Sequence, residues 1–198
     1  MTTTRIILAG VLGGIAMFIW TSIAHMATPL GHAGIREFPN EEKVLAALQT
    51  ALGDNSGFYL FPGLGVGDHP TRKQEKEAMT HYEEKLANNP AGILLYYRAG
   101  VRSLAMGRWL TIEFLTELLE AILVVFLLAQ TRIGSFGGRV GFVFVAGILA
   151  AIATNVSYWN WYGFPKRYIA AYMFIQIVGF LCIGLVAALV LRSQREEG

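Results

Sequence analysis

Long apolar stretches without charge dominate the pattern of this chain. Residues 6–24 and 168–191 contain no charged side chain, and two more apolar stretches lie between residues 109 and 163. About 20 residues of α-helix cross the hydrocarbon core of a bilayer, and the uncharged stretches approach or exceed that length. The pattern therefore predicts four membrane-spanning helices, at about residues 5–25, 109–130, 138–163 and 167–191.

The stretch between the first two spans is polar and carries local signals of its own. Apolar residues at helical spacing, capping residues and short runs of β-forming residues alternate along it. The elements expected are an extended segment at 34–38, a helix N-capped by Asn40, the strand GFYLF, a helix that begins with a Thr71–Gln74 capping box and runs to about Leu86, and the strand GILLYY.

These elements predict an all-α membrane bundle of four transmembrane helices, with a small extracytoplasmic α/β insertion between helices one and two. Residues 1–25 would form the first transmembrane helix and 26–108 the extracytoplasmic α/β cap. Residues 109–198 would supply transmembrane helices two to four and a short cytoplasmic tail.

The orientation follows from the basic residues that flank the spans, because cytoplasmic flanks are enriched in lysine and arginine. Two basic residues, Lys166 and Arg167, fall on the side expected to be outside. The opposite side, which we therefore expect to be cytoplasmic together with both termini, carries Arg5, Arg132, Arg139, Arg192 and Arg195.

Composition agrees with a membrane location and excludes some functions. Of the 198 residues, 54% are hydrophobic and only 15% are charged, whereas a soluble domain has about 25% charged residues. The net charge of +2 and the lack of a basic cluster with interleaved aromatic residues argue against nucleic-acid binding. A single cysteine, Cys182, leaves no disulfide framework and no cysteine-based metal site.

Two motifs, FYLFPG and WNWYGFP, resemble those of a group of uncharacterised bacterial four-span inner-membrane proteins. A capped helix precedes the first motif and an apolar span follows the second, so the resemblance would cover most of the chain. It implies a bacterial inner (plasma) membrane and a multi-pass topology, and it implies no activity.

Three carboxylates, Glu113, Glu117 and Glu120, interrupt the second apolar stretch. A helix turns about 100° per residue, so they fall within about a 60° arc and form one stripe about 10 Å long. A carboxylate facing lipid near mid-bilayer costs upwards of about 2.5 kcal/mol. We therefore expect the stripe to face the interior of the bundle.

Polar residues on the other predicted spans could meet this stripe. The expected polar cavity, open to the outer leaflet, is formed by His25, Glu113, Glu117, Glu120 and Asn155. Three hypotheses remain: the carboxyl groups serve helix packing, they line a cavity that binds a ligand or passes protons, or they hold a metal together with His25. The paired histidine motifs typical of metal sites do not occur, so the sequence assigns no metal, cofactor or catalytic residue.

Two further patterns indicate how the helices are held in the membrane. The aromatic residues Trp159, Trp161 and Tyr162 close the third predicted span and are expected to form an interfacial belt. Gly10 and Gly14 form a small-xxx-small pair, which favours close helix packing within the bundle.

The function expected from the sequence is that of a non-catalytic accessory subunit, or of a binding protein for a partner, lipid or small ligand at the outer leaflet. The alternative is a membrane enzyme or a proton- or ion-coupled carrier that uses the glutamate stripe. The expected partners are the lipid bilayer and a membrane protein complex.

Overall fold

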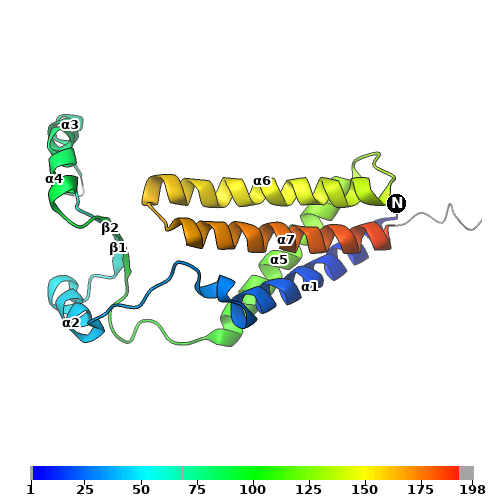
Figure 1. Cartoon of the computed structure of the whole chain (residues 1–198), viewed down its shortest axis with the longest axis horizontal. Helices are drawn as coiled ribbons and strands as arrows, with labels where there is room; N and C mark the ends of the chain where they lie inside the picture. The colour runs from blue at the N-terminus through cyan, green and yellow to red at the C-terminus, as the bar shows by residue number, and fades with distance from the viewer. Residues whose placement is uncertain (1, 68, 192–198) are drawn as a thin grey trace, which may run out of the picture. The chain divides into compact units, whose positions relative to one another are not determined.

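The structure is a computed structural model, and it describes residues 2–67 and 69–191. It is mostly helical and divides into two compact units (Figure 1). The helical unit comprises the chain up to residue 36 and from residue 105 onward, and the small unit comprises residues 37–104.

All four predicted spans are helices, and their ends lie within three residues of the predicted ones. These helices are α1 (Thr3–Ala27), α5 (Met106–Ala129), α6 (Phe136–Tyr162) and α7 (Lys166–Val190). Within the described residues, α1, α6 and α7 are long and apolar enough to cross a membrane, which is consistent with an integral membrane protein.

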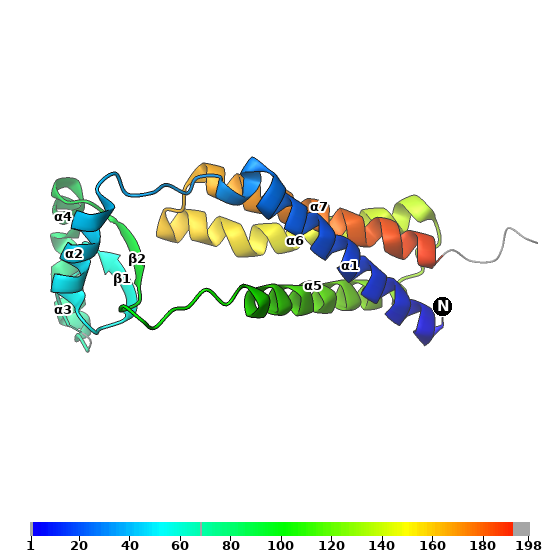
Figure 2. The ribbon, with the colours of Figure 1, turned by 90° about the horizontal axis from the view of Figure 1, so that it is seen from below.

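Close approach of helix backbones organises the helical unit, in which α1 packs against both α5 and α7, and α6 packs against α7 (Figures 1 and 2). Gly10 faces Ile122 of α5, and Gly14 faces Leu118 one turn away. A Cβ atom on Gly14 would lie 2.8 Å from the Cα atom of Leu118, so no side chain fits there. The prediction that the glycine pair serves packing within the bundle is confirmed.

The contact between α1 and α7 uses the same device together with one hydrogen bond. Gly13 faces Ile183, and the Trp20 indole Nε1–H donates to the Ile175 carbonyl oxygen at 2.9 Å. The largest fully buried side chains of the molecule lie in this unit and are Leu128, Ile183, Val125 and Val143. The core of the described chain is therefore built from all four long helices, with Ala9 and Met17 contributed by α1.

Arg139, expected only as a flanking charge, is buried, with 5% of its surface exposed. Its Nε donates to the Ile133 carbonyl at 3.3 Å, and its Nη1 donates to the carbonyl of Leu191, the C-cap of α7. A cation at a helix C-terminus is stabilised by the free carbonyl groups there. Arg139 thus ties the beginning of α6 to the end of α7.

The small unit contains α2 (Glu41–Leu52), β1 (Gly57–Phe61), α3 (Arg72–Thr80), α4 (Tyr82–Asn88) and β2 (Gly92–Tyr96). The strands form a two-stranded antiparallel sheet in which Tyr59 is opposite Leu94. Both strands and the Thr71–Gln74 capping box are as predicted. The unit is therefore a two-stranded antiparallel sheet with three short helices, two of which lie in the connection between the strands.

Two expectations for this part of the chain are wrong. The segment 34–38, expected as the first strand of the cap, forms no strand: Gly34 has a φ of 79° and lies against the backbone of Tyr168 at the start of α7. The helix expected to run from Thr71 to Leu86 is interrupted at His81, whose backbone (φ −104°, ψ 2°) ends α3 before α4 begins.

We expect Gly14→Ala to lower the stability of the helical unit by about 1–3 kcal/mol, because the added methyl group forces the backbones of α1 and α5 apart. The matched control is Gly141→Ala on α6, where a Cβ meets no atom within 4 Å. Thermal unfolding in detergent should give a lower midpoint for Gly14→Ala and an unchanged or slightly higher one for Gly141→Ala. Equal midpoints would show that the close approach contributes nothing.

Candidate functional site

The glutamate stripe runs along α5 from an exposed residue to a buried one. Glu113 is exposed, Glu120 is half-buried, and Glu117 between them is only 3% exposed. Glu113 and Glu120 lie close enough to Glu117 for their charges to act on it. The stripe is therefore one electrostatic group whose middle member is enclosed.

Glu117 meets α1 at Thr21, which is itself buried. The Thr21 hydroxyl has one hydrogen and donates it to the Phe18 carbonyl at 3.1 Å. The same hydroxyl also hydrogen-bonds the Glu117 carboxyl group, so its one hydrogen is shared between that group and the Phe18 carbonyl.

One oxygen of this carboxyl group, Glu117 Oε2, is buried and has no hydrogen-bond partner. It is the only buried side-chain oxygen or nitrogen in this condition among the residues that the structure describes. Buried polar groups are nearly always paired, because an unpaired one loses its bonds to water without replacement. Glu117 is thus the clearest chemical anomaly of the described chain.

A pair of aromatic rings joins α1 and α5 next to Glu117. Phe18 of α1 and Phe114 of α5 meet edge to face with ring centroids 5.2 Å apart. Each lies three residues before the Thr21–Glu117 contact, on the same side of its helix. This ring pair sets the spacing of α1 and α5 next to the carboxyl group.

His25, the next candidate, contacts α7 through Tyr172. Their ring centroids are 5.4 Å apart, and Tyr172 stacks on Tyr168 at 4.3 Å. Tyr172 also lies within electrostatic reach of Glu113. His25 and Glu113 thus share a neighbour. The sequence reasoning missed Tyr168 and Tyr172, although two tyrosines one turn apart at the start of a span are a usable signal.

Asn155 is buried on α6, and its side-chain amide donates hydrogen bonds to groups other than the glutamates. Its Nδ2 donates to the Ala151 carbonyl at 3.0 Å and to Gln176 Oε1 on α7 at 3.4 Å. The structure therefore places Asn155 in the contact of α6 with α7. Its convergence with His25, Glu113 and Glu117 on one cavity stays a prediction.

Nothing in the described residues forms a metal centre: no group of three or more histidine, cysteine, aspartate or glutamate side chains is arranged to hold an ion. His25 packs its ring against Tyr172. The three glutamates of α5 offer hydrogen-bond acceptors and negative charge to a ligand or a proton.

The aromatic residues proposed as an interfacial belt gather at the end of α6. Trp159, Trp161 and Tyr162 are all exposed there. Gly163 then takes a left-handed conformation (φ 68°), and its N–H donates to the Tyr158 carbonyl, which ends the helix. Exposed indole and phenol rings at a helix end are what a membrane-interface anchor requires.

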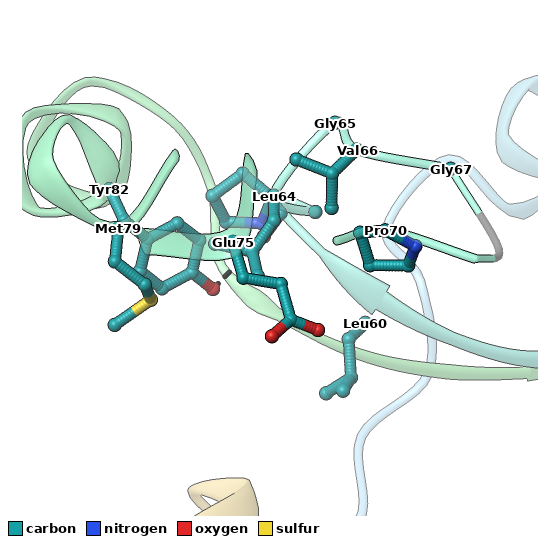
Figure 3. A pocket seen from close by; sticks show the side chains of 11 residues that line it. Leu60, Leu64, Gly65, Val66, Gly67, Pro70, Glu75, Met79 and Tyr82 are labelled. Atoms are coloured by element: carbon teal, nitrogen blue, oxygen red, sulfur yellow. Dashed lines mark hydrogen bonds between the residues drawn. The ribbon is translucent and has the colours of Figure 1, made fainter. Parts of the chain in front are cut away.

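The small unit holds a second candidate site, a pocket of about 560 Å³ between the glycine-rich loop and α3 (Figure 3). Its lining is mainly apolar, with Leu60, Leu64 and Met79 around the carboxylate of Glu75. Tyr82 donates to the Pro62 carbonyl at 3.0 Å and fixes one end of the loop. The pocket was not predicted from the sequence.

One face of the β-hairpin beside this pocket is apolar. Phe58 pairs with Leu95, and Leu60 pairs with Ile93, so these four side chains lie on the same face of the sheet. Phe58, Leu60 and Leu95 are each more than half exposed. We call this set the hairpin face.

Comparison of the chain with protein-family models, curated proteins and solved structures gives no match. The two motifs that resemble four-span membrane proteins lie in separate units. FYLFPG covers most of β1 and the turn after it, and WNWYGFP forms the end of α6 and the turn before α7. The resemblance therefore stays a prediction.

We expect Glu117→Gln to preserve the fold and to change the stability by about 1 kcal/mol or less, since glutamine keeps the shape and most of the hydrogen bonding. Glu117→Leu should cost more, because it also removes the contact with Thr21. Thermal unfolding of both variants beside Glu113→Gln, at an exposed position, makes the comparison. A large loss in Glu117→Gln alone would show that the negative charge itself is structural.

Proposed function

We propose that this chain is a four-span membrane protein that serves as a non-catalytic accessory subunit and docks a partner protein through its small unit. Two sets of observations support the proposal. The packing of α5 supports the fourth span, and the exposed apolar surface of the small unit supports the docking role.

The case for α5 as a span rests on its contact with α1. Gly10 meets Ile122, Gly14 meets Leu118 and Phe18 meets Phe114, so the two helices run antiparallel and side by side over more than two turns. The 24 residues of α5 extend about 36 Å, enough for the hydrocarbon core. If α1 crosses the bilayer, α5 packs beside it and therefore lies at the same depth in the membrane.

The proposed location is a bacterial inner membrane with both termini in the cytoplasm. Support comes from the two motifs and from the excess of arginine on the flanks assigned to the cytoplasm. Residues between α1 and α5, including the small unit, are then extracytoplasmic, and the exposed end of the glutamate stripe faces the outer leaflet.

The docking role rests on a single observation, the burial pattern of the small unit. In its described residues, 37–67 and 69–104, only Pro62 is buried. Meanwhile Phe58, Leu60 and Leu95 on the hairpin face are 55%, 57% and 57% exposed. A two-stranded hairpin is only marginally stable in water without an apolar partner. A partner protein would cover this face.

The partner's chemistry follows from the surface. Each strand of a two-stranded sheet has one free edge, and an extended segment can add to such an edge through main-chain hydrogen bonds. The adjacent pocket accepts an apolar side chain beside Glu75. Residues 37–104 contain nine acidic and seven basic residues, a balance that disfavours an anionic membrane surface as the occupant. We therefore propose an extended, apolar protein segment.

The topology is tested with single cysteines in a chain whose Cys182 is replaced by alanine. A cysteine at Ser56 should react with a membrane-impermeant maleimide in intact cells, because the small unit is outside. A cysteine at Ser135, in the turn between α5 and α6, should react only after lysis. The reverse labelling would invert the proposed orientation.

The docking role is tested with a photo-crosslinking amino acid at Leu95 in the native membrane. We expect a discrete crosslinked protein, and we expect Leu60→Glu, which places a charge on the same face, to abolish it. Crosslinker at Thr50, exposed on α2, is the control position. Crosslinks only to lipid or only to a second copy of the chain would contradict an accessory role.

A further inference from the structure

The unpartnered carboxyl oxygen of Glu117 marks an incomplete site that the docking role does not use. Glu117 Oε2 lacks a donor although the side chain is almost fully enclosed. Thr21, the polar neighbour from α1, has a single hydrogen that also serves the Phe18 carbonyl, so it does not satisfy both oxygens of Glu117. What the site lacks is a hydrogen-bond donor, and a ligand could supply it.

The charge of the site indicates which donor it would take. Glu113 and Glu120 add negative charge on either side of Glu117, and no ion pair of these three residues occurs within the described chain. Arg108, the nearest basic residue in α5, is nine residues from Glu117 and therefore on the opposite side of the helix. Three acids without a base match a cation better than a neutral donor.

The surroundings of the site indicate what the cation is attached to. Phe18 and Phe114 adjoin Glu117, and Leu110, two turns before Glu117 on the same face of α5, is also exposed. Glu113 is exposed and so provides an approach from the surroundings of α5. A ligand that reaches Glu117 along this path has an apolar body and a small charged head.

We infer that the Glu113–Glu117–Glu120 stripe binds the primary ammonium group of an amphiphile, with Glu117 accepting an N–H hydrogen bond. A primary ammonium combines one positive charge with three N–H donors. A primary ammonium can therefore donate a hydrogen bond to Glu117 Oε2 and balance the negative charge of the flanking carboxylates at the same time. A quaternary ammonium carries the same charge but no N–H, and an alcohol has a donor but no charge.

Three probes with the same tail separate these properties. The full chain is placed in phosphatidylcholine nanodiscs, whose own headgroups are quaternary, and its melting temperature is measured against added dodecylammonium, dodecyltrimethylammonium or dodecanol. We expect dodecylammonium to raise the melting temperature by about 5 °C when it is about a hundredfold above its dissociation constant. The other two should leave it nearly unchanged. Equal stabilisation by both cations, or none by dodecylammonium, would overturn the inference.

Variants locate the site. Glu117→Gln should weaken dodecylammonium binding by about 10- to 100-fold, the range expected for a charge-assisted hydrogen bond. Glu113→Gln, at an exposed position, should weaken it by about 2- to 5-fold. Glu84→Gln on α4 is a matched control and should bind like the wild type. Undiminished binding to a folded Glu117→Gln protein defeats the assignment, and the three probes on the wild type decide the matter even if that variant does not fold.

A last arm identifies the source of the ammonium group. Phosphatidylethanolamine carries a primary ammonium, so nanodiscs that contain it are compared with phosphatidylcholine discs. A rise in melting temperature that is lost in Glu117→Gln would assign the site to a lipid headgroup. A response to dodecylammonium alone would assign it to a free amphiphilic amine. The docking experiment on the small unit is independent of all these outcomes.

Discussion

The close approach of α1 to its two neighbours determines the arrangement of the helical unit. Helices in lipid gain no hydrophobic stabilisation from association, so they depend on direct packing and interhelical hydrogen bonds. Gly14 allows contact with α5, and the adjacent Gly13 allows contact with α7 on a face turned by about 100°. Because α1 is held on both sides, Thr21 meets Glu117 and His25 meets Tyr172.

The two units expose apolar side chains for different reasons. In the helical unit an exposed leucine such as Leu149 on α6 matches a lipid environment and needs no further explanation. In the small unit the exposed Phe58 and Leu95 lie on a hairpin beside charged helices. Single exposed apolar residues are common in proteins, but a continuous apolar face next to a pocket marks an interaction surface. This contrast is the physical basis for assigning the docking role to the small unit.

The sequence predicted each element whose signal is local. Length and hydropathy placed the four long helices, and the Thr71–Gln74 box placed the start of α3. The prediction of a strand at 34–38 was wrong because the conformation of this segment depends on a tertiary contact, the packing of Gly34 against Tyr168. Such a contact leaves no periodic pattern in the chain.

The candidate site was predictable only in part for a related reason. Helical periodicity places Glu113, Glu117 and Glu120 on one face of α5, but it does not say which helix that face meets. In the structure Glu117 contacts Thr21 of α1, and Asn155 donates a hydrogen bond to Gln176 of α7. Likewise, the sequence analysis treated Arg139 as a flanking surface charge. Its hydrogen-bond acceptor at the end of α7, the Leu191 carbonyl, lies about fifty residues later in the chain.

The glutamates of α5 carry a cost that its packing partner does not remove. Glu113 is exposed and Glu120 half-buried, and the enclosed Glu117 keeps an unpaired oxygen. The glycine contacts and the Phe18–Phe114 pair are made by other residues of α5, so replacing the three glutamates with apolar residues would leave those contacts in place. Packing alone therefore does not require carboxyl groups here. If α5 spans the membrane, as proposed, its ionisable residues are expensive there, and such residues usually mark a site that handles charge. A stripe that adds this cost and makes only one contact with α1, between Glu117 and Thr21, is best explained by the charge that it presents to a ligand.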